Sequence, residues 1–258
     1  EIAQCLVGSE MCIRDSYMRT NTHRRGLHRL VAFLLCAVCL FGLIPAQAFA
    51  MEPGQKASSW LGDQYVGSDG QHYYAPAPYT YLVYNSDGTM DARTSSGGNA
   101  YRHYMLTLSD GTSQQVYCVE SGIPYNTSDN SYTSESGTNS QYLNLLPAEA
   151  RRGITLATIY GWKPGASLPV SGINEDDYKM ATQIILWEYQ QQLRSDPYSR
   201  HGNGHASADQ YYSVIAGRPA EKAYNWILSQ VASHSTVPSF TSSKKSAVSY
   251  THLRAHET

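Results

Sequence analysis

The amino-acid sequence predicts an α+β fold, because strand patterns come first along the chain and helical patterns follow. The first half holds short runs rich in Tyr, Val and Thr that end in turn residues. The second half holds apolar residues spaced three or four apart. Residues 236–246 are expected to form a last strand or a linker. We therefore expect a helical lobe that interrupts a β lobe.

A hairpin is the clearest strand feature. Residues 79–84 and 101–108 are expected as strands. The turn sequence Ser-Asp-Gly follows the second of them, and residues 114–119 return as the other arm. Cys118 is expected on this arm, near its far end.

Four helices are expected after a polar loop at residues 120–140, whose length is typical of functional loops. Asn174 is the expected N-cap of the longest one, since three carboxylates follow it and suit the positive end of a helix. The helical patterns cover residues 147–161, 174–194, 207–216 and 219–233.

The two ends of the chain are not typical of a protein domain. Residues 1–16 and 248–258 resemble translated sequencing adapters and show no helical or strand periodicity, so we place the native start at Met18. Residues 1–17 are accordingly excluded from the fold. The native C-terminus is expected to be lost, which makes this chain a fragment of a longer protein.

Residues 18–50 are predicted to be a secretion signal. Basic residues precede an uncharged apolar run at residues 30–44, and the segment ends in Ala48-x-Ala50, a small-residue cleavage pattern. The alternative, an uncleaved anchor, is disfavoured because the apolar run is short for a membrane span. The mature domain is expected at residues 51–240, without membrane insertion. Residues 241–247 then begin a linker to further domains.

Charge excludes one class of partner. Residues 51–247 contain 17 acidic and 13 basic residues, a net charge of −4, with no basic stripe. Nucleic-acid binding is therefore not expected. Tyrosines are numerous among abundant Ser, Thr, Gly and Asn, which suits a solvated extracellular domain.

One cysteine remains once the ends and the signal are set aside. Cys118 is alone in the predicted mature chain, so it has no intramolecular disulfide partner there. A lone thiol in a secreted protein is either buried and inert or functional. Gln183 is the second unusual residue, because its carboxamide lies on or beside the apolar face of the long helix. By itself it is explained as a polar residue bonded to a loop at the edge of the core.

Together, the motifs Tyr117-Cys118-Val119 and Thr182-Gln183-x-x-Leu186-Trp187 resemble those of the thioester domains of Gram-positive surface adhesins. The resemblance covers most of residues 55–240. It implies a β-sandwich or barrel with a helical insertion, and a cell-surface location with anchoring to the cell wall.

The resemblance also implies a reaction. Cys118 would attack the Gln183 side-chain amide, expel ammonia and leave an internal thioester. A lysine amine on a host or surface protein would then displace the sulfur and form an amide. The domain is consumed in one turnover, so it is not an enzyme, and no cofactor is expected.

Four further residues are assigned supporting roles by the two motifs and their surroundings. The three aromatic ones are candidates for excluding water from the bond, although ordinary core packing explains each of them as well. The supporting residues are Tyr117, Thr182, Trp187 and Tyr189.

Two alternatives remain. A non-covalent binding or spacer module would bury Cys118 as an inert residue. A secreted cysteine hydrolase would use Cys118 with a histidine base, for which no recognisable motif exists. The candidate bases are His72, His103, His201, His205 and His234. A metal site at His201 and His205 is disfavoured, because intervening glycines argue for a loop and no third ligand is near.

Overall fold

The computed structural model describes residues 54–75, 78–85, 87, 89–119, 131–134, 141–202 and 208–234. The predicted signal, both atypical ends, the linker at residues 241–247 and the predicted strand at 236–246 lie outside these residues. The same holds for most of the polar loop at residues 120–140.

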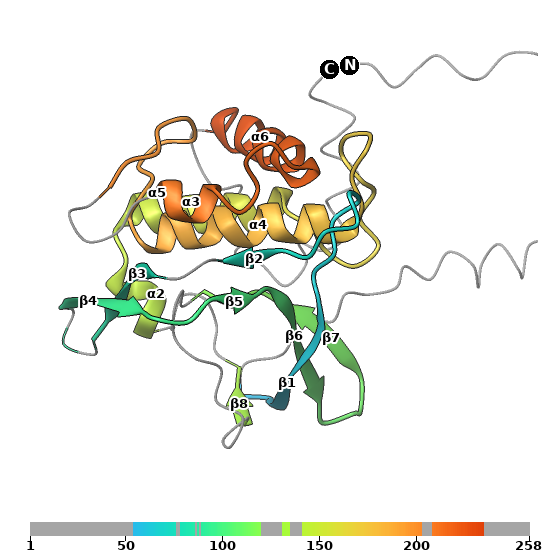
Figure 1. Cartoon of the computed structure of the whole chain (residues 1–258). Coiled ribbons are helices and arrows are strands. Elements are labelled where there is room, and N and C mark those ends of the chain that lie inside the picture. The colour runs from blue at the N-terminus through green and yellow to red at the C-terminus, as the bar shows by residue number, and fades with distance from the viewer. Residues whose placement is uncertain are drawn as a thin grey trace, which may run out of the picture. The chain divides into compact units, whose positions relative to one another are not determined.

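The strands build one larger sheet and two small ones, all antiparallel (Figure 1). The four-stranded sheet has the order β7-β6-β1-β8, and the pairs β2-β5 and β3-β4 are separate. No closed barrel is present in the part of the chain that the structure describes. The strands are β1 (Lys56–Gln64), β2 (Tyr74–Ala75), β3 (Tyr79–Tyr84), β4 (Met90–Ser95), β5 (Asn99–Ala100), β6 (Arg102–Leu108), β7 (Ser113–Val116) and β8 (Ser131–Thr133).

The helices follow in sequence and confirm the predicted mixed α+β class. Those at residues 147–161 and 219–233 are confirmed almost to the residue, since Pro147 and Gly161 cap α3 and a proline opens α6. None of the helices in the described segments is both long and apolar enough to cross a membrane. The helices are α2 (Gln141–Leu145), α3 (Ala148–Tyr160), α4 (Glu175–Gln190), α5 (Ala208–Tyr212) and α6 (Pro219–Ala232).

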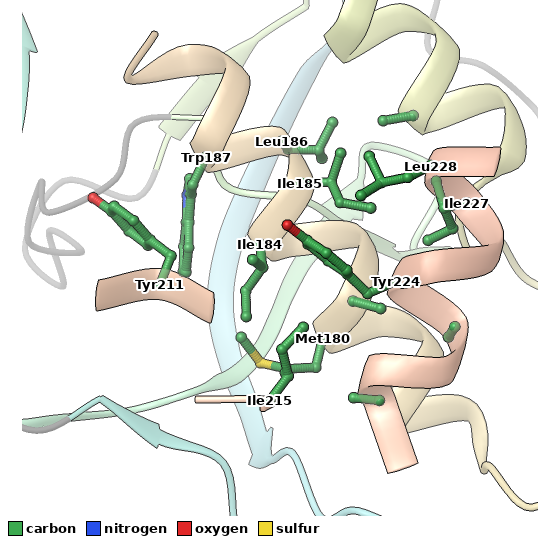
Figure 2. Close-up of a cluster of buried hydrophobic side chains, with 14 of the residues drawn as sticks. Met180, Ile184, Ile185, Leu186, Trp187, Tyr211, Ile215, Tyr224, Ile227 and Leu228 are labelled. Atoms are coloured by element: carbon green, nitrogen blue, oxygen red, sulfur yellow. The ribbon is translucent and has the colours of Figure 1, made fainter. Parts of the chain in front are cut away.

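Helix α4 is the centre of the core. Every residue from Asp177 to Gln190 is buried, because α3, α5 and α6 all pack against this helix. Figure 2 shows Ile185 directed toward the α6 residues Ile227 and Leu228, with Tyr224 beside them. A helix buried on all sides has little freedom to shift, which suits an element that must hold a reactive group.

The acidic first turn of α4 does more than favour the helix dipole. Asn174 and Asp177 form a reciprocal capping box, as the predicted N-cap requires. Asp177 also accepts hydrogen bonds from the Ser68 main chain and from the Tyr73 hydroxyl. Asp176 accepts one from the main chain of Val66. These bonds attach the segment after β1 to the start of α4.

Three predicted ends are wrong. The helix predicted at residues 207–216 stops at Tyr212. Helix α4 stops at Gln190 and not at residue 194, and Gln192 has a φ of 54°, which is incompatible with continuing a right-handed helix. Strand β7 stops at Val116 and not at residue 119, so Cys118 lies two residues beyond the sheet. The main chain of Cys118 has a different partner.

Candidate functional site

The partner of the Cys118 main chain is the side chain of Gln183. The Cys118 amide N–H donates to Gln183 Oε1 at 3.0 Å, and Gln183 Nε2 donates to the Cys118 carbonyl oxygen at 2.6 Å. One carboxamide thus satisfies both main-chain groups of one residue. The strand ends at Val116 because the next main-chain pairing is made to helix α4 and not to β6.

Gln183 reaches this position from the middle of α4. It is only 1% exposed, and a buried carboxamide is tolerated there because both of its polar atoms are bonded. Taken by itself, Gln183 is predicted to be a polar residue that bonds to a loop, and the structure shows such a bond. The loop residue that it contacts is the cysteine.

The pairing keeps the two proposed reacting atoms near each other. A main-chain N–H 3.0 Å from Oε1 means, from standard bond lengths, that the Cys118 sulfur lies within about 8 Å of Gln183 Cδ. Rotation about the Cys118 Cα–Cβ bond moves the sulfur relative to that carbon. Cys118 is half-buried and forms no disulfide in the described residues.

The hydrogen bond to Gln183 Oε1 draws electron density toward that oxygen, which makes Cδ a better target for a nucleophile. Attack on Cδ places negative charge on Oε1, and the Cys118 N–H already points at that atom. The arrangement can therefore stabilise the oxyanion of a tetrahedral intermediate. No rearrangement of the donor is required for this step.

Tyr117 and Thr182 precede Cys118 and Gln183 in the sequence, and both bond to the main chain of Trp162. The Tyr117 hydroxyl donates to the Trp162 carbonyl at 2.8 Å. Burial raises the pKa of the Tyr117 phenol well above its usual value, so the hydroxyl stays neutral and can donate. The Trp162 N–H donates to Thr182 Oγ1 at 3.0 Å.

The other two supporting residues have packing contacts of their own. The Trp187 ring lies 5.5 Å from that of Tyr101 and 5.9 Å from that of Tyr211, as Figure 2 shows for the second pair. Tyr189 packs over Gly153 of α3, where a Cβ atom would meet its ring at 2.2 Å. These contacts match the core-packing explanation. The role of Trp187 and Tyr189 in excluding water stays a prediction.

Three residues near the pair escaped the sequence analysis. Trp162 joins both motifs, and its ring lies 4.3 Å beneath the Lys179 ammonium group. Lys179 precedes Gln183 by one helical turn and is held by two carboxylates of the same helix. Tyr142 donates its hydroxyl proton to the Val119 carbonyl at 3.0 Å. Only the four-residue spacing between Lys179 and Gln183 was visible in the sequence.

The histidines proposed as bases have contacts elsewhere. His103 faces Gln115 with Nδ1 at 3.0 Å and Asp176 with Nε2 at 3.4 Å. His234 lies 2.7 Å from the Tyr160 hydroxyl. Nδ1 of His201 lies 3.2 Å from the carbonyl of the following glycine. His72 forms a β-bridge with Val66, and His205 lies outside the described residues.

Metal ligands do not gather within the described segments, where no group of three or more His, Cys, Asp or Glu side chains could hold an ion.

Comparison with known protein families gives one match, over residues 115–233, to the family described as TED: Thioester domain. Residues 115–233 form a thioester domain. The matched range includes Cys118, Gln183 and the elements that position them, from β7 to α6. No curated protein and no solved structure matches the chain.

The match over residues 115–233 confirms the resemblance found in the two short motifs. Thioester domains form covalent bonds with amine-bearing targets. The strands before β7 lie outside the matched range, although β1 pairs with β8 and β6 pairs with β7.

Proposed function

We propose that this chain is a secreted surface adhesin whose Cys118 and Gln183 form an internal thioester that captures an amine. The observation that carries the proposal is the double hydrogen bond between the Gln183 carboxamide and the Cys118 main chain, at 3.0 and 2.6 Å. It supports a nucleophile and an acyl group that are held close together, the first just beyond strand β7 and the second on the buried helix α4.

Bond formation proceeds in two balanced steps. The Cys118 thiolate adds to Gln183 Cδ, the oxyanion is stabilised by the Cys118 N–H, and the nitrogen leaves as ammonia with the former thiol proton. The amine of a target lysine then adds to the same carbon. Sulfur leaves and takes up a proton, and a stable amide joins Gln183 to the target. Because the amide is not released, the reaction is a single turnover and not enzymatic.

The wider setting belongs to the same proposal. The mature domain occupies residues 51–240, follows a signal at residues 18–50, and combines a β-sandwich with inserted helices. Further domains anchor it to the wall of a Gram-positive bacterium, where the target is a lysine-bearing host or surface protein.

Intact mass spectrometry tests the proposal. We expect the mature chain to weigh one ammonia less than its sequence requires and to gain one methylamine on exposure to that amine. Cys118→Ala and Gln183→Ala should each abolish both effects. A full-mass wild-type chain that is inert to methylamine would overturn the proposal and favour a non-covalent module. Turnover of an ester or amide substrate would favour the hydrolase.

A further inference from the structure

The residues immediately before Cys118 and Gln183 are connected through one loop residue. Tyr117 precedes the cysteine and donates to the Trp162 carbonyl at 2.8 Å. Thr182 precedes the glutamine and accepts from the Trp162 N–H at 3.0 Å. Both polar groups of the Trp162 main chain are therefore used to join the two motifs.

Close packing reinforces the connection between the two motifs. Gly161 brings the loop so near to α4 that a Cβ atom there would lie 2.3 Å from Thr182 Cγ2. Thr182 is fully buried and also donates to the Tyr178 carbonyl at 2.8 Å, so its hydroxyl has one fixed orientation.

We propose that Tyr117 and Thr182 are positioning residues, which act through Trp162 to set the approach of the Cys118 sulfur to Gln183 Cδ. This inference rests on the proposed thioester. The hydrogen bonds to the carboxamide hold Cys118 at one point, and Tyr142 adds an attachment at Val119, but neither contact holds the side of Cys118 that faces the strand. An attachment one residue earlier on each element holds that side.

Positioning by Tyr117 and Thr182 differs from exclusion of water. An apolar ring of the same size as that of Tyr117 would also exclude water. Positioning depends on the hydroxyl groups and is lost when they are removed while the ring or the branched shape remains. A displacement of about 1 Å of reacting atoms can slow a reaction by roughly a hundredfold. We expect at least a tenfold slower thioester formation.

The test measures formation of the thioester in the secreted chain. Excess ammonium first returns the site to Cys118 thiol and Gln183 carboxamide, and the loss of ammonia is then timed by intact mass after the ammonium is removed. Tyr117→Phe and Thr182→Val remove one hydroxyl each and keep the shape. Thr182→Ser keeps the hydroxyl and should restore most of the rate.

A matched control separates positioning from stability. Tyr73→Phe removes a buried hydroxyl that donates to Asp177 at the far end of α4, away from the pair. All variants are compared at a temperature where each is folded. We expect at least tenfold slower formation in Tyr117→Phe and Thr182→Val, and a rate within about twofold of the wild type in Tyr73→Phe.

Two results overturn the inference. Formation at the wild-type rate in Tyr117→Phe and Thr182→Val would show that the hydroxyls only stabilise the fold, while the proposed thioester would stand. An equal slowing in Tyr73→Phe would show a general effect of stability. A wild-type chain that never loses ammonia would instead refute both the thioester and the positioning role.

Discussion

Replacing Gln183 by Glu should destabilise the folded protein in a way that depends on pH. The carboxylate can still accept from the Cys118 N–H. In the native protein, Gln183 Nε2 donates to the Cys118 carbonyl oxygen at 2.6 Å. The second carboxylate oxygen of glutamate takes the place of Nε2 and cannot donate. Two acceptors then face each other in a site that is 1% exposed for the native side chain.

The magnitude follows from the lost donor and the buried charge. An unsatisfied buried polar group costs about 1–3 kcal/mol, and more when it is charged, so we expect a loss of about 3 kcal/mol at neutral pH. For a domain of this size that loss lowers Tm by about 6–12 °C. Protonation restores a donor, so the folded state raises the pKa of this carboxyl group. The lost stability should therefore return as the pH falls through the raised pKa.

Thermal unfolding between pH 4 and 8 measures this effect. The comparison is made in a Cys118→Ala background, in which no thioester forms and the main-chain pairing remains. Gln210→Glu, at an exposed position of α5, is the control and should stay within about 0.5 kcal/mol of its parent. Equal stability of the Gln183→Glu chain and its parent at pH 7 would refute the described pairing.

Two further changes probe the elements around the site. Gly161→Ala should cost about 1–3 kcal/mol in urea unfolding, because the new methyl would overlap Thr182 although a φ of −73° permits alanine. Gly97→Ala, with nothing within 4 Å, should be neutral, and equal effects would contradict the close packing. Arg218→Gln should cost up to about 1 kcal/mol at pH 7, since the pair with Asp69 is partly exposed. The arginine lowers the Asp69 pKa, so the part of the cost that comes from the ion pair should vanish as the pH falls through that pKa. The part that comes from the bonds of Arg218 to the main-chain carbonyls of Gln71 and His72 should remain, and a cost that does not change with pH would argue against the ion pair.

The helices were predictable because their signals are local. Asn174 and the carboxylates after it indicate the start of α4, and Pro147 and Gly161 indicate the two ends of α3. Each of these residues acts on main-chain groups within one turn, so neighbouring sequence is enough to identify it. The apolar spacing of α4 also indicated burial, but not that its polar residues would be buried too.

The contacts between distant segments were not predictable in the same way. Nothing in the sequence around residue 66 shows that its main chain binds Asp176, which lies 110 residues later. Trp162 was missed as a link between the motifs because it contributes its main chain, which every residue possesses. The strand pattern likewise extended past Val116, since alternation of side chains does not reveal which partner the main chain has.

Two separate properties explain a glutamine at position 183. Its carboxamide makes hydrogen bonds that the fold requires, and it can supply the acyl group of the proposed thioester. A carboxamide is the side-chain group that can accept from one main-chain N–H and donate to the C=O of the same residue, which the fold requires here. Glutamine alone therefore does not demonstrate a thioester. The sulfur of Cys118 is different, because the pairing with Gln183 uses only main-chain atoms of the cysteine. Cys118→Ala should keep the fold and remove the nucleophile, whereas every change at Gln183 alters both. The cysteine is thus the position at which folding and reactivity can be separated by experiment.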